Sequence, residues 1–186
     1  MQKRKIGPST MLFPMPSVLV GAKTSGRANF MTVAWCGIAS HQPPAICVAV
    51  RKKRFTLDGI ESNAKFSVNI PGADLMKKVD FCGIYSGRDK DKSGLFTVFI
   101  GDLEDVPLIE ECPVNLECVL KHQLDLGSHW LVIGEIVQTH ISEDCYTEDK
   151  ADPLKINPLI YSPSSQNYHR LGEIVGKAFY DGRDFE

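Results

Sequence analysis

The sequence predicts a mainly β fold, a barrel of antiparallel strands with a few short helices. The first observation is that apolar and polar residues alternate from Val114 to Leu124, which is typical of a strand with one buried face. The second is that His129–Ile141, after a turn at 126–128, is another long and largely apolar strand. Strands of this length favour a closed barrel over a flat sheet, because barrel strands are tilted and must be long.

The strands before this hairpin are apolar and β-branched runs separated by turn residues. Ser17–Lys23 is the first predicted strand, Thr24–Arg27 turns the chain, and Phe30–Ala39 returns as its hairpin partner. His41–Pro44 contains two prolines, which supply no hydrogen-bond donor to a ladder, so it is predicted to be a connection. Ala45–Val50 is an uninterrupted apolar run and gives the next strand.

Two helices are predicted in the middle of the chain. The first is Thr56–Ala64, with Thr56 as its N-cap and a carboxylate in the first turn, where it favours the positive end of the helix dipole. Phe66–Ile70 is a strand, and Ala73–Tyr85 has the periodicity of a second helix. Ser86–Gly94 is a charged loop that composition alone assigns to solvent.

The remaining segments give weaker patterns. Phe96–Ile100 and Leu108–Ile109 are predicted to be short strands, and the tail Tyr161–Phe179 is predicted to contain a turn and then a short helix. The sequence contains no repeat and no linker long enough to separate two domains. We therefore expect residues 1–186 to form one domain.

Composition narrows the classes of function. The net charge of -2 argues against a nucleic-acid partner, and no segment reaches the length needed to cross a membrane. Pro8, Pro14 and Pro16 interrupt the apolar stretch near the N-terminus, which argues against a signal peptide. The six cysteines are scattered, without a C-x-x-C or a metal-ligand spacing. We expect reduced thiols, no metal site and a cytoplasmic location.

A candidate anion site lies at the start of the helix predicted at Thr56. The N-terminus of a helix offers unpaired N–H groups and a partial positive charge, which suit a phosphate. The run Arg51–Arg54 comes directly before it, although four cations by themselves are most often a solvated loop. A preceding strand carries Asn29, Thr32 and Trp35, and an aromatic ring among polar side chains suits a ring-bearing phosphorylated ligand.

Taken together, these segments resemble the flavin reductase-like family, the FMN-binding split barrels. The likeness begins with N-F-M-T-x-A-W, P-P and the basic turn ending in F-T, all within Asn29–Thr56. It continues, in the expected order, at Phe81–Lys92 (F-C-G-I-Y-S-G-R-D-x-D-K), Ser128–Val137 (S-H-W-L-V-I-G-E-I-V) and Tyr168–Gly176 (Y-x-R-L-G-E-I-V-G). Within the family, the sequence is most similar to the flavoredoxin and ferric-reductase branch.

The resemblance implies an antiparallel Greek-key split β-barrel that binds FMN non-covalently, and a homodimer with the flavin near the subunit interface. It assigns the flavin ring system to Asn29, Thr32 and Trp35, and the phosphate to Lys53 and Thr56. The full set of residues expected at the cofactor is Asn29, Met31, Thr32, Trp35, Lys53, Thr56, Cys82, Lys92, His129 and Tyr161. No side chain is assigned a catalytic role.

The function that this implies is flavin-dependent electron transfer by an NAD(P)H:flavin or ferric reductase, or by a flavoredoxin-like protein. Electrons would pass to a redox partner protein or a small acceptor, without nucleic acid or membrane. The sequence has no G-x-G-x-x-G fingerprint and no P-loop, so NAD(P)H would dock transiently on the flavin. Two alternatives stay open: an FMN-binding electron carrier without its own NAD(P)H activity, and a flavin-free split barrel that acts as an interaction module.

Overall fold

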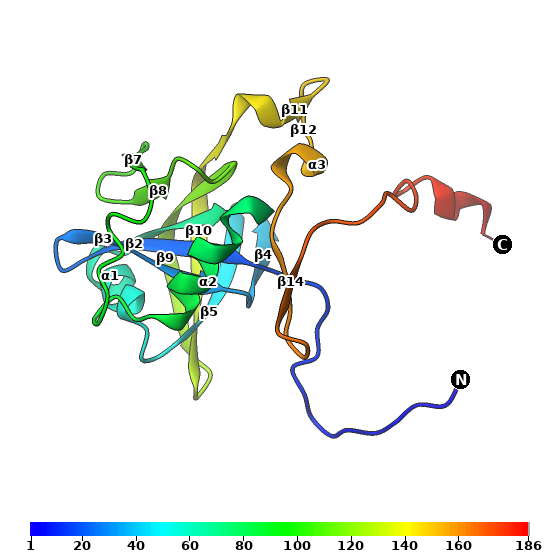
Figure 1. Ribbon diagram of the computed structural model, residues 1–186, viewed down its shortest axis with the longest axis horizontal. Helices are drawn as coiled ribbons and strands as arrows, with labels where there is room; N and C mark the ends of the chain where they lie inside the picture. The colour runs from blue at the N-terminus through cyan, green and yellow to red at the C-terminus, as the bar shows by residue number, and fades with distance from the viewer. Residues whose placement is uncertain (186) are drawn as a thin grey trace.

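A seven-stranded antiparallel sheet forms the centre of the protein in a computed structural model, which describes residues 1–185 (Figure 1). Its strand order is β3-β2-β6-β9-β10-β5-β4. The bounds are β2 Val18–Thr24, β3 Arg27–Val33, β4 Cys36–His41, β5 Pro44–Arg51, β6 Lys65–Ile70, β9 Val114–Asp125 and β10 His129–Ile141. The consecutive strands β3 and β4 lie at opposite edges of this sheet, so the barrel is split between them.

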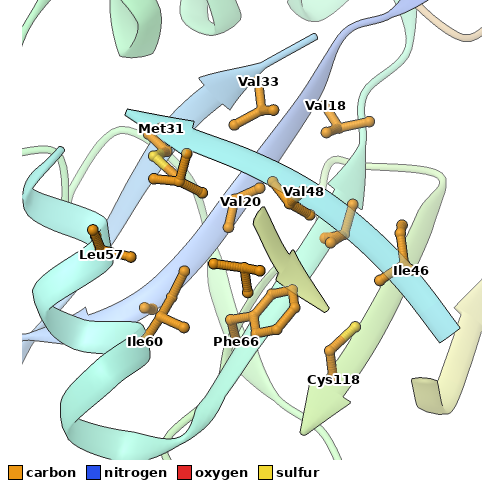
Figure 2. Close-up of a cluster of buried hydrophobic side chains, with 14 residues drawn as sticks. Val18, Val20, Met31, Val33, Ile46, Val48, Leu57, Ile60, Phe66 and Cys118 are labelled. Atoms are coloured by element: carbon orange, nitrogen blue, oxygen red, sulfur yellow. The ribbon is translucent and has the colours of Figure 1, made fainter. Parts of the chain in front are cut away.

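Two helices cover the sheet. α1 (Phe55–Asn63) packs Leu57 and Ile60 into the core inside the barrel, and Figure 2 shows both facing Met31 and Phe66. α2 (Met76–Ile84), which follows the 3₁₀ turn η1 (Ala73–Leu75), packs against the other face of β3. Alternate residues of β3 therefore belong to two cores, one inside the barrel and one beneath α2.

Smaller elements surround the barrel. β1 (Met15–Pro16) pairs with β13 (Ile160–Ser162), which pairs with β14 (Asn167–His169), so the two ends of the fold share one three-stranded sheet. The other elements are β7 Val98–Ile100, β8 Pro107–Ile109, η2 Glu143–Cys145, β11 Tyr146–Thr147, β12 Lys150–Ala151, α3 Pro153–Ile156 and η3 Asp181–Asp184. No helix among the described residues is both long and apolar enough to span a membrane.

The predicted mainly β barrel with few short helices is confirmed, together with its long hairpin. β9 and β10 pair along their length, and β2 and β3 form the first predicted hairpin. The two weak patterns before the long hairpin are strands β7 and β8, which pair with each other. The predicted turn in the tail lies between β13 and β14.

Several local predictions are wrong. Phe30–Ala39 is not one strand, because the chain bends after Val33 and the Trp35 carbonyl accepts a hydrogen bond of 2.9 Å from the Ala49 N–H. The connection between β4 and β5 is shorter than His41–Pro44, since those two residues pair in the ladder. The tail has no helix at 161–179, since residues 160–169 form the β13–β14 hairpin and residues 170–177 have no regular secondary structure.

The predicted N-cap and the predicted one-sided burial of the long strand are also wrong. Arg54, with an extended backbone, is the N-cap of α1, and Thr56 lies inside the helix. Asn115 and Glu117 of β9 are both buried, although the alternation places them on the solvent face. The segment from β7 to β8 covers that face of the sheet, because Ile109 O and two backbone N–H groups of the intervening loop bond to these side chains.

All six cysteines are free thiols, and four are buried. Burial raises the pKa of Cys36 to about 12 and that of Cys82 to about 11. Because the thiolate is the reactive form, we expect these two to react slowly with a thiol reagent at pH 8 in the native protein. In denaturant without prior reduction, all six should react, and a smaller number would reveal a disulfide.

Candidate functional site

A cleft of about 640 Å³ lies beside the split in the barrel, a volume within the usual range for small-molecule sites. The end of β3 and the bend after it form one wall, with the end of β5 and the start of β10. The end of α2 and the β13–β14 hairpin form the rest. Five of the ten predicted site residues line this cleft: Met31, Thr32, Trp35, His129 and Tyr161.

Two arginines from one tight turn also line the cleft. The Arg54 N–H donates to the Arg51 carbonyl at 3.0 Å, so residues 51–54 form a turn whose first and last residues lie close together. The central residues point elsewhere: Lys52 forms a 2.7 Å salt bridge with Asp125, and Lys53 is exposed. The two arginines of the basic run therefore line the cleft, and its two lysines do not.

Arg54 is held in place by the end of α2. Its Nη1 donates to the Gly83 carbonyl at 3.1 Å, where a cation is favoured by the negative end of the helix dipole. Burial lowers the pKa of this guanidinium, and the neighbouring Arg51 lowers it further. An anion between the two arginines would relieve this repulsion, and planar guanidinium groups bind phosphate oxygens in pairs.

An aromatic pair lies next to Arg51. His129 begins β10 and is paired with Arg51 in the ladder, and its ring centroid lies 4.9 Å from that of Trp35, with the planes 30° apart. The pKa of His129 is lowered by burial and by the charge of Arg51, which favours the neutral imidazole at pH 7. Trp35 is 40% exposed and so offers ring surface to a ligand.

The opposite wall of the cleft connects α2 to the β13–β14 hairpin. The Tyr168 hydroxyl donates to Asp80 Oδ1 at 3.0 Å, and its ring lies 5.7 Å from that of Tyr161. Burial and the Asp80 carboxylate raise the pKa of Tyr168, so this phenol stays protonated. Thr32 joins the same helix to β3, because its hydroxyl donates to the Val79 carbonyl.

Asn29 and Thr56 do not line the cleft. Both are buried, and Asn29 Nδ2 donates to Thr56 Oγ1 at 2.7 Å. The loop after α2 lies against this pair, since a Cβ added at Gly87 would come within 2.0 Å of Asn29 Oδ1. Arg88 holds the loop over α1 through a 2.7 Å salt bridge with Asp58. In this structure the pair therefore joins β3 to α1.

Lys92, Cys82 and Lys53 also lie outside the lining of the cleft. Lys92 is 2% exposed, and its Nζ donates to the carbonyls of Phe30 at 2.9 Å and Cys82 at 3.1 Å. Burial lowers the pKa of Lys92. The Cys82 side chain belongs to the core beneath α2. Ligand contacts for these residues, and for Asn29 and Thr56, stay predictions.

Among the charged and aromatic residues that line the cleft, four are absent from the set predicted from the sequence: Arg51, Arg54, Asp80 and Tyr168. The basic run indicated that cations lie near the site. Which two of its four cations line the cleft depends on the turn at 51–54, which the sequence pattern does not reveal. Tyr168 begins the last of the segments that carry the family resemblance. Asp80 has no distinguishing pattern in the sequence, because it is one charged residue of an amphipathic helix.

Residues 10–171 match the family model of the flavin reductase like domain. The chain belongs to the flavin reductase-like family. Flavoredoxin from Methanosarcina acetivorans is 37% identical, with a TM-score of 0.95 over 98% of each chain. Flavoredoxin of Desulfovibrio vulgaris (Miyazaki F) is 36% identical, with a TM-score of 0.91 over 98% of this chain and 100% of the other. An FMN-binding protein from Thermus thermophilus is 26% identical, with a TM-score of 0.82 over 95% and 99% of the two chains.

Membership of this family confirms the predicted resemblance and the split-barrel fold. The likeness to two flavoredoxins covers nearly the whole chain, so it includes the turn with the two arginines and the hairpin with the two tyrosines. The fold thus supports a flavin-related function, and the cleft contains side chains that suit a flavin.

Proposed function

We propose that this chain is an FMN-binding flavoprotein that transfers electrons, with FMN held non-covalently in the main cleft. The observation that carries the proposal is that two arginines and an exposed tryptophan line one cleft of a flavin reductase-like fold. The similarity to two flavoredoxins and to an FMN-binding protein supports FMN as the flavin.

The residues that line the cleft fit this group. Arg51 and Arg54 would bind the phosphate. Trp35 and His129 would contact the ring system, and Tyr161 would close it from the hairpin side. When bound, the flavin supplies the redox chemistry, and the protein supplies its position, its shielding from water and the surrounding charge.

The favoured activity is that of an NAD(P)H-dependent flavin or ferric reductase, with the nicotinamide docking transiently at the open side of the cleft. Purified protein loaded with FMN should be yellow, and its flavin absorbance should bleach under anaerobic conditions when NADH or NADPH is added. Bleaching by dithionite but by neither nicotinamide would identify a carrier that depends on a redox partner. Failure to retain FMN at all would contradict the cofactor and favour a flavin-free interaction module.

We further propose that the protein works as a homodimer in the cytoplasm and passes electrons to a redox partner protein or a small acceptor. Two large exposed apolar side chains line the cleft, Trp35 and Ile84, and they support an interface there. The six free thiols are compatible with a reducing compartment. Sedimentation of the purified chain tests the dimer directly.

Trp35→Phe should remove most of the quenching of tryptophan fluorescence by FMN. Trp35 lines the cleft, whereas the Trp130 ring lies under Lys52, with Nζ 5.0 Å from its centroid. A phenylalanine keeps an aromatic contact, so we expect the fold to persist and FMN affinity to fall only modestly. Trp130→Phe is the matched control. If quenching survived in Trp35→Phe and disappeared in Trp130→Phe, the flavin would lie against a different wall.

A further inference from the structure

A second hollow, here called the apolar groove, adjoins the main cleft. It has a volume of about 500 Å³ and lies between the N-terminal segment 9–16 and strands β4 and β5. Its lining is predominantly apolar, with Met11 and Leu12 on one side and Leu131 on the other. Trp35 lines both hollows, so a segment that fills the groove contacts a residue of the main cleft.

The groove is bordered by an open strand edge. β4 is the last strand of the seven-stranded sheet and pairs only with β5 among the described residues. Its Ile38 is 71% exposed. Such an edge presents unpaired backbone groups to an added strand, and native proteins cover or protect it. The groove and this edge thus form one continuous docking surface for an extended apolar segment.

An extended apolar segment is present at the C-terminus. Residues 170–185, here called the C-terminal arm, leave the fold after β14 and project away from the barrel (Figure 1). Ile174 is 79% exposed and Val175 is fully exposed. In the described part of the chain, the hydrogen bonds of residues 171–183 all join this segment to itself. Nothing in its own subunit therefore buries these side chains.

The arm projects from the side of the molecule on which the groove lies. The N-terminal segment that walls the groove continues into β1, and the arm continues from β14 of the same three-stranded sheet. In Figure 1 both chain ends extend from this side, beyond the barrel. In a dimer with a two-fold axis, the arm of each copy can cover the groove and the β4 edge of the other copy.

We propose that the C-terminal arm of one copy docks in the apolar groove of a second copy, with residues 171–175 alongside β4. The exchange is reciprocal, and each arm covers the outer face of Trp35 in the other copy. The partner thus completes the wall of the main cleft. This docking mode rests on the proposed homodimer, but it does not depend on the chemistry of FMN.

The test measures the dimer dissociation constant by analytical ultracentrifugation, on flavin-free and on FMN-loaded protein. Removal of residues 171–186 should raise that constant at least about tenfold, as should Val175→Asp in the arm and Ile38→Asp on the β4 edge beside the groove. Leu126→Asp is the matched control. Leu126 is also a large exposed apolar residue, but it lies at the β9–β10 turn, outside both the groove and the arm. Circular dichroism melts establish that each variant is folded.

A mixing experiment then separates arm exchange from any other dimer. In a mixture of Val175→Asp and Ile38→Asp chains, the heterodimer contains one wild-type arm in one wild-type groove. Its other exchange carries both substitutions, but an arm that one substitution has already undocked loses little more from the second. Mixed chains should therefore associate more tightly than either variant alone. A monomeric full-length chain, or truncation without effect on the dissociation constant, would overturn the inference. So would a mixture no tighter than its components. Because flavin-free protein is included, failure to bind FMN would leave this test intact.

Discussion

Replacing Arg54 by alanine is expected to weaken FMN binding roughly 10- to 150-fold while leaving riboflavin binding nearly unchanged. The range follows from losing one charge-assisted hydrogen bond, worth about 1.5–3 kcal/mol. Riboflavin lacks the phosphate, so it reports on the ring site alone. Both affinities can be measured by titration of flavin fluorescence or by calorimetry.

The comparison with Lys53→Ala tests which residue binds the phosphate: Arg54, as the geometry of the cleft indicates, or Lys53, as the family resemblance implies. Lys53 is exposed at the centre of the 51–54 turn, and Arg54 lines the cleft. We expect Lys53→Ala to change FMN affinity by no more than about fivefold, because an exposed charge pair contributes under about 1 kcal/mol. A selective loss of FMN in Lys53→Ala would restore that assignment. Equal weakening of both ligands in Arg54→Ala would mean that Arg54 acts through its contact with Gly83.

The fold was predictable because its strongest signals are local. The long alternation and the glycine turn between β9 and β10 specify a hairpin without knowledge of distant residues. The bend at Trp35 was not predictable, since the Ala49 N–H that holds it comes from another strand. The N-cap was misplaced for a similar reason. Thr56 has the right chemistry for a cap, but its hydroxyl is taken by Asn29, which lies 27 positions earlier.

The site was predictable in part. Residues from Met31 to Trp35, at the end of β3 and in the bend after it, line the cleft, and they belong to the same short motif that the sequence singles out. Lys92 is different, because the sequence places it in a charged loop that composition assigns to solvent. In the structure it is buried and binds two carbonyl groups. A lysine that satisfies backbone acceptors leaves no local pattern, so only the tertiary structure reveals it.

Glu117 is the clearest case of tertiary structure overriding a local pattern. The alternation in β9 places it on the solvent face, yet it is fully buried. Its Oε1 accepts from the Asp102 N–H at 2.9 Å, its Oε2 from the Leu103 N–H at 2.6 Å, and His140 Nε2 lies 2.7 Å from Oε1. Gly101 makes the approach possible, because a Cβ there would meet Oε1 at 2.1 Å. One buried carboxylate thus accepts hydrogen bonds from two backbone N–H groups of the loop that covers the sheet.

Glu117→Ala should lower the free energy of unfolding by about 3–5 kcal/mol, the usual cost of breaking a buried charged network. Two backbone N–H groups would lose their acceptor while the loop still shields them from water. Glu135→Ala is the control: its salt bridge with Lys121 is also 2.7 Å long, but both side chains are partly exposed, so the loss should stay below about 1 kcal/mol. Urea denaturation measures both. Equal losses in the two variants would show that the loop opens and lets water replace the carboxylate.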